Sequence, residues 1–205
     1  MSPLIFTLLA YGIGAIPTSF WVGKVGYGVD LRMKGSGNLG GTNVFRVLGW
    51  KMALPVIVID VCKGWLPTWY FPQIHPDTAP STWAFAYGGA AILGHVFSFW
   101  VGFKGGKGVA TSGGVFLAVA PLAVLGCSVV WLAVFLITRT SSLGSLSAVL
   151  AALPLLYVLP HREGPTVFWF TIVLITFIFW AHRSNIRRLL RGEEKSFENG
   201  SEDRI

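Results

Sequence analysis

The sequence predicts an all-α integral membrane protein with seven transmembrane helices, one of them short. Hydrophobic residues make up 53% of the 205-residue chain and charged residues only 12%. The mean hydropathy of +0.63 is too high for a soluble domain of this size. The apolar residues form runs of roughly 20, the length of a helix that crosses a bilayer. The short loops between those runs carry most of the basic residues.

Five apolar segments each predict one spanning helix. Their ranges are 4–23, 52–71, 82–101, 145–160 and 165–181. The first has no Lys or Arg before Lys24, so it lacks the charged start of a secretory signal. We therefore expect it to be retained as the first span.

A further apolar block, 109–138, is too long for one ordinary span and contains Pro121. Because proline disrupts a helix interior, we predict a short helix near 109–120 and a second near 122–138. The division affects the topology, since a single span here would place Arg139 on the opposite side of the membrane from the other basic loops.

The distribution of Lys and Arg predicts the orientation. With this division, 14 basic residues fall on one side of the membrane and only Arg162 on the other. The 14 are Lys24, Arg32, Lys34, Arg46, Lys51, Lys104, Lys107, Arg139, Arg183, Arg187, Arg188, Arg191, Lys195 and Arg204. Because cytoplasmic loops are rich in Lys and Arg, we predict an external N-terminus and a cytoplasmic C-terminus in a bacterial inner membrane.

The whole chain, 1–205, is predicted to form one membrane domain with a polar cytoplasmic tail over 192–205. Cys62 and Cys127 lie in apolar segments, where we expect buried thiols and neither a disulfide nor a metal site. The net charge of +7 comes from loops between spans, so we expect contact with membrane lipid and phosphate compounds and not with nucleic acid.

The first basic segment contains a glycine-rich run. Gly35, Gly37 and Gly40 match the pattern G-x-G-x-x-G, but no strand–helix–strand unit surrounds them, which argues against dinucleotide binding. Glycine nevertheless lets backbone amides approach an anion, and a helix beginning near Thr42 would direct its positive end toward it. The candidate phosphate ligands are Ser36, Gly37, Asn38, Gly40, Thr42, Asn43 and Arg46. The alternative is a flexible connector that needs only solubility.

A second basic segment follows His95 and places Lys104 and Lys107 on either side of a glycine pair. Gly108 follows Lys107 where an ATP-binding P-loop has Ser or Thr, so ATP use is not implied. The two lysines and the start of the next helix could hold a phosphate from two sides. The candidate residues are His95, Lys104, Gly105, Gly106, Lys107 and Gly108. The alternative is that the lysines only set the topology.

Asp60 and Lys63 stand three residues apart inside the second span, hence on one helix face. A charge there costs about 2.5–3.5 kcal/mol on insertion scales, so both must be paired or face a polar cavity. The pair either is purely structural or orients the substrate-binding loops.

Polar residues also mark the cytoplasmic ends of two later spans. Ser142 either caps the helix that follows it or contacts phosphate. His182, Asn185 and Arg188 share a helical face at the end of the last span. That face suits a phosphate or carbonyl contact, and lipid anchoring by the arginines is the competing interpretation.

Together these segments resemble the bacterial acyl-phosphate:glycerol-3-phosphate acyltransferase family, the PlsY type. The matching segments are Gly35–Arg46, Asp60–Gly64, Gly94–His95, Phe103–Thr111, Ser141–Leu143, His182–Arg188 and Gly192–Lys195. They occur in order over nearly the whole chain, which is more specific than any one motif.

The resemblance implies a seven-helix membrane enzyme with its site on the cytoplasmic face. It implies transfer of a fatty acyl group from acyl phosphate to the 1-hydroxyl of glycerol 3-phosphate, giving lysophosphatidic acid and phosphate. Neither acyl carrier protein nor coenzyme A is then needed as the donor, and we expect no cofactor.

An acyl phosphate is already activated, so the protein must mainly hold two anions together and stabilise a tetrahedral oxyanion. We predict direct attack without an acyl-enzyme, with the proton passing to a substrate phosphate oxygen, to His95 or to His182. Lys104, Lys107 and the Ser36–Thr42 backbone would neutralise the acyl phosphate. Arg46, Ser142, His182 and Asn185 would hold glycerol 3-phosphate.

Two other functions fit part of this pattern. A small-anion transporter would also use seven helices and buried charges, but it gathers its binding groups near the membrane midplane, whereas nearly all candidates here lie at one face. A hydrolase would use the same acyl-phosphate site and admit water. A glycerol 3-phosphate pocket separates the transferase from the hydrolase.

Overall fold

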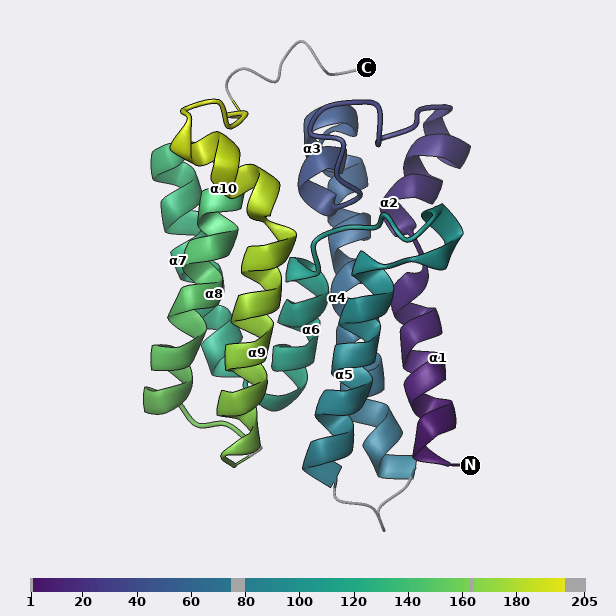
Figure 1. The fold of residues 1–205 in the computed structure, drawn as a ribbon, viewed down its shortest axis with the longest axis vertical. Coiled ribbons are helices and arrows are strands. Elements are labelled where there is room, and N and C mark those ends of the chain that lie inside the picture. Colours follow the sequence, from purple (N-terminus) through teal and green to yellow (C-terminus); the bar gives the residue numbers. More distant parts are fainter. Residues whose placement is uncertain (1, 75–79, 163, 198–205) are drawn as a thin grey trace. The chain divides into compact units, whose positions relative to one another are not determined.

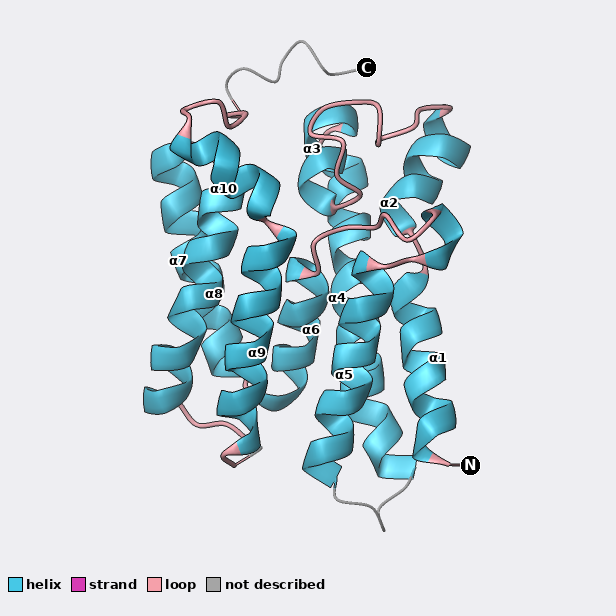
Figure 2. Cartoon of the chain, in the orientation of Figure 1, coloured by secondary structure: helices cyan, strands magenta, loops and turns pink. Residues whose placement is uncertain are grey.

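The computed structural model describes residues 2–74, 80–162 and 164–197, and all regular structure in these ranges is helical, without strands (Figure 2). The helices form two compact units. One is built from residues up to Ala118 and the other from Val119 onward, so the boundary falls at the end of helix α6 (Val109–Val119).

In the first unit, α1 (Pro3–Ala15), α4 (Trp50–Ile74) and α5 (Pro80–Val96) lie side by side (Figure 1). Shorter elements join them: α2 (Thr18–Trp21), the π-helical turn η1 (Val22–Gly26), α3 (Gly41–Leu48) and the 3-10 turn η2 (Phe99–Val101). Buried side chains from the three long helices form one core of this unit: Phe6, Ala10, Phe71, Tyr87 and Ala90.

The second unit contains α7 (Pro121–Thr138), α8 (Ser141–Val158), α9 (Thr166–Ala181) and α10 (Arg183–Leu190). Helix α8 packs against both α7 and α9 (Figure 1). The division of 109–138 at Pro121 agrees with the structure, because α6 ends at Val119 and Pro121 is the first residue of α7. Proline is favourable at that position, where its missing amide hydrogen has no intrahelical partner to lose.

The first predicted span is present as one candidate membrane span, Pro3–Gly26, but its helix is interrupted. We predicted a continuous helix over 4–23, whereas α1 ends at Ala15 and helical structure resumes only at Thr18. Pro17 lies in the gap. Proline has no backbone N–H to donate, and its ring clashes with the preceding turn of a helix. The break releases carbonyl groups that other parts of the unit must satisfy.

Five helical segments in the described ranges are long and apolar enough to cross a membrane. A sixth is obtained if α9 and α10, which are inclined at 62°, are counted as one bent span. Helix α6 is apolar but has only 11 residues, in keeping with the prediction of one short helix. Over the described residues the protein is therefore all-helical, with five or six spans by this criterion, and the count of seven stays a prediction.

Glycines allow close helix packing at two places in the first unit. They are Gly14 and Gly94 between α1 and α5, and Gly64 and Gly114 between α4 and α6. A Cβ atom at any of the four would overlap backbone atoms of the facing helix. Small residues at helix contacts are typical of membrane proteins. In lipid, the association of helices depends on close van der Waals packing because the hydrophobic effect does not drive it.

The contact between α4 and α6 predicts opposite effects for two adjacent substitutions. We expect Gly114→Ala to lower the free energy of unfolding by about 1–3 kcal/mol, because the methyl group would meet the carbonyl of Val61. Gly113→Ala is the matched control, since a Cβ there meets nothing within 4 Å and alanine favours the helix by up to about 1 kcal/mol. Thermal unfolding in detergent measures both, and equal stability of the two variants would contradict this packing.

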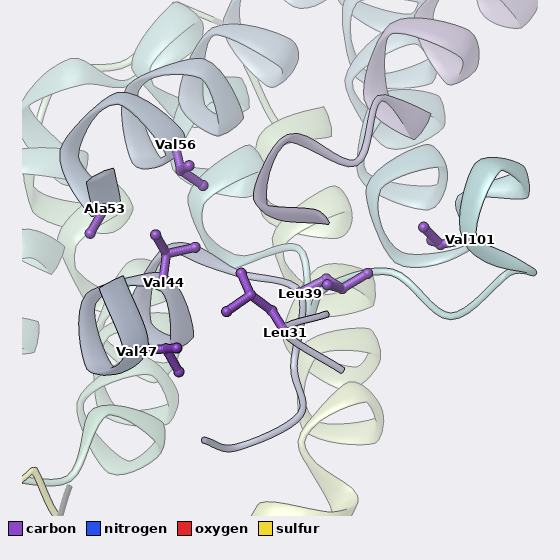
Figure 3. Close-up of a cluster of buried hydrophobic side chains, with 7 residues drawn as sticks. All are labelled: Leu31, Leu39, Val44, Val47, Ala53, Val56 and Val101. Carbon is purple, nitrogen blue, oxygen red and sulfur yellow. The ribbon is translucent and has the colours of Figure 1, made fainter. Parts of the chain in front are cut away.

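A buried apolar cluster supports the glycine-rich loop (Figure 3). Its members come from the loop, α3, α4 and η2: Leu31, Leu39, Val44, Val47, Ala53, Val56 and Val101. Leu31 and Leu39 anchor the part of the loop that contains Ser36, Gly37 and Asn38, while Val44 and Val47 anchor the helix that follows it. The loop is thus anchored by its own apolar residues, which argues against a flexible connector.

Candidate active site

Asn43 shapes the glycine-rich loop from inside. Its side chain is 1% exposed, and its Oδ1 accepts a hydrogen bond of 2.8 Å from the amide of Ser36. Its Nδ2 donates to the carbonyls of Leu31 and Lys34 at 3.0 and 3.1 Å. Gly35 has a φ of 60° and lies against Oδ1 of Asn43, so only glycine suits this position. These bonds make Asn43 a loop-positioning residue, and its predicted contact with substrate stays untested.

The backbone amides of the loop are largely used within it. Besides the Ser36 amide, the amide of Gly37 donates to Lys34 at 3.0 Å and that of Gly40 to Asn38 at 3.1 Å. Binding phosphate through these amides would require the loop to exchange hydrogen bonds. Side chains are therefore the donors that suit this conformation, and the exposed hydroxyl of Ser36 is one of them.

Three cationic side chains belong to the same unit. Arg46 lies on α3, is 6% exposed and has its Cδ beside Gly35 at the start of the loop. Lys104 is exposed and Lys107 is half-buried, on the segment between η2 and α6. Thr42 lies in the first turn of α3, so the helix predicted to begin near it is present.

The second basic segment folds back onto the end of α5. The amide of Gly105 donates to the Val96 carbonyl at 2.9 Å, and the amide of Gly106 donates to the His95 carbonyl at 3.1 Å. A Cβ at Gly106 would overlap Nε2 of His95 and would also meet the carbonyl of Leu39. The two segments that the sequence marked as phosphate sites therefore meet at Gly106. Gly108, with a φ of 83°, then turns the chain into α6.

Asp60 and Lys63 form a buried ion pair, with Nζ 2.6 Å from Oδ1 and side-chain exposures of 3% for the lysine and 2% for the aspartate. The same Nζ donates to the carbonyl of Ile16 at 2.5 Å. His95 is also buried, and its Nδ1 lies 3.8 Å from Oδ1 of Asp60. The structure thus joins three predicted residues from α4 and α5 into one array.

In the second unit, three predicted ligands converge on a carboxylate that the sequence reasoning did not select. Ser142 Oγ donates to Oε1 of Glu194 at 2.7 Å and Asn185 Nδ2 donates to the same oxygen at 2.5 Å. Arg188 Nε donates to Oε2 at 2.7 Å. Ser142 therefore bonds to the tail, and the alternative that it caps α8 is not supported, because Thr140 occupies the N-cap.

The chain reversal after α10 brings Glu194 to this position. The amide of Gly192 bonds to the Leu189 carbonyl and that of Glu193 to the Arg188 carbonyl, and Gly192 has a φ of 69°. This is a Schellman motif, in which glycine adopts the left-handed conformation that ends a helix. The only sequence signal for Glu194 was its place in the Gly192–Lys195 segment of the family resemblance.

The described part of the tail is anchored at a second point. The amide of Phe197 donates to the carbonyl of Arg139 at 3.0 Å, and its ring meets that of Phe135 edge to face at 5.1 Å. His182, the fourth candidate of this unit, is 2% exposed and its Nδ1 donates to the carbonyl of Ile178 at 2.9 Å. In that tautomer Nε2 is the acceptor nitrogen.

Partial burial raises the pKa of the Glu194 carboxyl, but hydrogen bonds from Ser142, Asn185 and Arg188 outweigh this and hold it below its usual value. A depressed pKa in the folded state means that ionised Glu194 stabilises the fold. That contribution is present above the unfolded pKa of about 4.3 and is lost as the pH falls through the lower folded value.

We expect Glu194→Gln to lower the free energy of unfolding by about 1–3 kcal/mol at pH 7, because the charge-assisted bond to Arg188 is lost. The difference from the unsubstituted protein should shrink as the pH falls below the unfolded pKa of about 4.3 and vanish below the lower folded pKa. Glu193→Gln is the matched control, since Glu193 is the adjacent, exposed carboxylate. Chemical denaturation in detergent at several pH values measures both. A loss that is the same for both variants, or the same at all pH values, would contradict the network.

The arrangement is suited to binding anions. Each unit presents cations together with hydroxyl and amide donors, which recognise phosphate oxygens. Within the described ranges, no group of three His, Cys, Asp or Glu side chains is placed to hold a metal ion.

Comparison with known proteins adds a family. The sequence model described as glycerol-3-phosphate acyltransferase matches residues 4–192. A glycerol-3-phosphate acyltransferase of Geobacter sulfurreducens is 41% identical over 198 residues, which cover 97% of this chain and 99% of the relative. One of Listeria welshimeri is 43% identical over 197 residues, covering 93% of this chain and 94% of the relative.

Two solved structures are similar to this fold. One is the crystal structure of PlsY (YgiH), an integral membrane glycerol 3-phosphate acyltransferase, in its glycerol 3-phosphate form. It gives a TM-score of 0.87 at 39% identity and covers 96% of both chains. The lysophosphatidic acid form of PlsY gives a TM-score of 0.85 at 38% identity, covering 96% of this chain and 95% of that one.

Proposed function

The chain belongs to the glycerol-3-phosphate acyltransferase family, and we propose that it takes the acyl group from an acyl phosphate and passes it to the 1-hydroxyl of glycerol 3-phosphate. The products are lysophosphatidic acid and inorganic phosphate. The acceptor and product are supported by the solved relatives, which contain glycerol 3-phosphate and lysophosphatidic acid. The donor is the one that the family resemblance implies.

The observation that carries the donor assignment is the meeting of the two basic segments at Gly106. Ser36, Lys104 and Lys107 lie on those segments, and a hydroxyl with two ammonium groups suits the doubly charged phosphate of an acyl phosphate. In the reaction this phosphate is also the leaving group. The same cations therefore stabilise the negative charge that develops on it.

Within the second unit, we assign glycerol 3-phosphate to the polar set Ser142, His182, Asn185 and Arg188, and Arg46 stays a ligand predicted from the sequence alone. Glu194 orders three of these four, since it accepts a hydrogen bond from Ser142, Asn185 and Arg188. Fixing these side chains in advance reduces the ordering cost when an anion binds, although the single O–H of Ser142 donates to Glu194 and would have to be exchanged in the complex. Glu194 is accordingly a positioning residue.

The proposed step is direct. The 1-hydroxyl oxygen attacks the acyl carbonyl carbon, and the tetrahedral intermediate collapses by breaking the bond between that carbon and the phosphate oxygen. The hydroxyl proton leaves with the phosphate or passes to a histidine. No bond to the protein forms, because an acyl phosphate needs no further activation.

We also propose that the membrane is the inner membrane of a bacterial cell, that α6 is the short fourth span of seven, and that all the basic segments except the one containing Arg162 face the cytoplasm. Support comes from the 14 basic residues that this topology places on one side. The alternative topology, without α6 as a separate span, would put Arg139 outside.

Cysteine labelling tests this topology. In a variant without Cys62 and Cys127, we expect Lys34→Cys and Arg139→Cys to react only with a reagent added from the cytoplasmic side, and Arg162→Cys only from the outside. All three positions are exposed, so access is set by the membrane. Outside labelling at Lys34→Cys would overturn the orientation, and at Arg139→Cys alone it would remove α6 as a span.

Product analysis tests the proposed function. Purified protein is mixed with acyl phosphate, with and without glycerol 3-phosphate. We expect lysophosphatidic acid and phosphate in equal amounts when both substrates are present, and little phosphate release otherwise. Rapid phosphate release without glycerol 3-phosphate would indicate a hydrolase and would contradict the proposal.

A further inference from the structure

The break in the first span is closed by polar side chains from two other elements. Ser98 Oγ donates to the carbonyl of Ala15 at 2.5 Å, and Lys63 Nζ donates to the carbonyl of Ile16 at 2.5 Å. Because Pro17 interrupts the helix, these carbonyls lack their usual intrahelical partners. In a membrane protein such groups must find partners inside the protein. Lys63 thereby links α4 to the break.

Asp60 connects that link to His95. Its Oδ1 lies 2.6 Å from Lys63 Nζ and 3.8 Å from His95 Nδ1, and all three side chains are buried. The only charged groups that the described contacts place around the imidazole are this carboxylate and this ammonium. The array therefore runs from the broken end of α1, through α4, to the last turn of α5.

His95 supports the segment that carries the two lysines. Its backbone carbonyl accepts the amide of Gly106, and its Nε2 lies directly beneath the Cα of Gly106, where a methyl group would overlap it. Both ring nitrogens thus face protein groups, Asp60 on one side and the Gly106 backbone on the other. Nε2 is thus crowded by the Gly106 backbone, and only 8% of His95 is exposed, which leaves little room for a substrate hydroxyl.

We propose that Asp60, Lys63 and His95 are positioning residues that hold the Lys104–Gly108 segment in place for the donor phosphate, and that His95 is not the proton acceptor. This inference rests on the proposed function. Of the three proton acceptors considered above, this proposal excludes His95. A substrate phosphate oxygen and His182 remain. The buried charges of Asp60 and Lys63 then have a second role besides pairing with each other. Through His95 they hold the Lys104–Gly108 segment in position.

Two substitutions of His95 separate positioning from proton transfer. Neither glutamine nor alanine can accept a proton at neutral pH, but glutamine fills most of the space beneath Gly106 and alanine does not. Loss of a general base would reduce kcat by about 10²–10⁴-fold in both variants. Positioning predicts that His95→Gln keeps kcat within about 10-fold of the unsubstituted protein, while His95→Ala loses about 100-fold in kcat/KM for acyl phosphate.

The buried pair gives an independent test. Asp60→Asn and Lys63→Met should each lower the thermal stability, because one charge is left without its partner, and the double variant should regain much of it. A purely structural pair predicts that activity returns together with stability. The proposal predicts that the double variant regains stability but keeps a raised KM for acyl phosphate, because His95 and the carbonyl of Ile16 have lost their contacts.

Gly106→Ala and Gly113→Ala complete the set. Gly106→Ala should raise the KM for acyl phosphate about 10-fold or more, since displacement of a group by about 1 Å can lower the rate 100-fold. Gly113→Ala should leave this KM unchanged, because a Cβ atom at Gly113 meets nothing within 4 Å. Equal loss of kcat in His95→Gln and His95→Ala, with an unchanged KM, would overturn the proposal. Failure of the unsubstituted protein to use acyl phosphate would instead refute the proposed function, so the two failures are distinct.

Discussion

Acyl coenzyme A is expected to be at least about 10⁴-fold poorer than acyl phosphate as a donor, because a site built around polar groups strongly rejects a substrate that leaves them unpaired. The thioester carries no phosphate next to the reacting carbonyl, so Ser36, Lys104 and Lys107 would have nothing to bind. The chain also lacks the His-x-x-x-x-Asp dyad of soluble-type acyltransferases. The residues five positions after its four histidines are Pro80, Trp100, Thr166 and Arg187.

The measurement is lysophosphatidic acid formation from each donor with the same acyl chain, at saturating glycerol 3-phosphate. In a control reaction, inorganic phosphate is added together with acyl coenzyme A. This control shows whether the slow reaction of acyl coenzyme A arises only because the phosphate position of the donor site is empty. Equal rates from the two donors would contradict the role assigned to the Lys104–Gly108 segment.

Lys104→Ala is expected to reduce kcat by about 10²–10³-fold, the loss that follows removal of one donor to a developing oxyanion. Lys104 is exposed in the absence of substrate, so its charge is available to the donor phosphate and contributes little to the fold. Lys104→Arg should retain part of the rate. Lys51→Ala, at an exposed lysine of α4 in the same unit, is the control and should be silent.

Arg46→Ala should instead act mainly on the KM for glycerol 3-phosphate, because a contact that is equal in the ground and transition states changes binding and not turnover. Arg46 is buried, so the thermal stability of the variant must be measured alongside. If Lys104→Ala changed only KM, or Arg46→Ala only kcat, the division of labour between the two residues would be wrong.

Much of the fold follows from local features of the sequence. The division at Pro121 followed from length and proline chemistry, and the pairing of Asp60 with Lys63 followed from their spacing of three residues. The break at Pro17 was missed because the 4–23 segment is uncharged and mostly apolar, which satisfies the length and hydropathy of a span. Proline alone does not decide such cases, since α4 continues through Pro55 and Pro67.

The network around Glu194 could not be predicted in the same way. Ser142 and Glu194 are 52 residues apart in sequence, and Ser98 and Ala15 are 83 apart. Such bonds depend on how the helices pack, which no local pattern encodes. The amides of the glycine-rich loop illustrate the same point, because only the position of the Asn43 side chain reveals that Ser36 already donates to a protein group.

Direct transfer is the central claim, and rapid mixing of the purified protein with acyl phosphate alone tests it most directly. Without glycerol 3-phosphate, a direct mechanism predicts no rapid stoichiometric release of phosphate and no acylated residue by mass spectrometry. A stoichiometric burst of phosphate, together with an acyl group on Ser36 or Ser142, would contradict the account and establish a covalent intermediate.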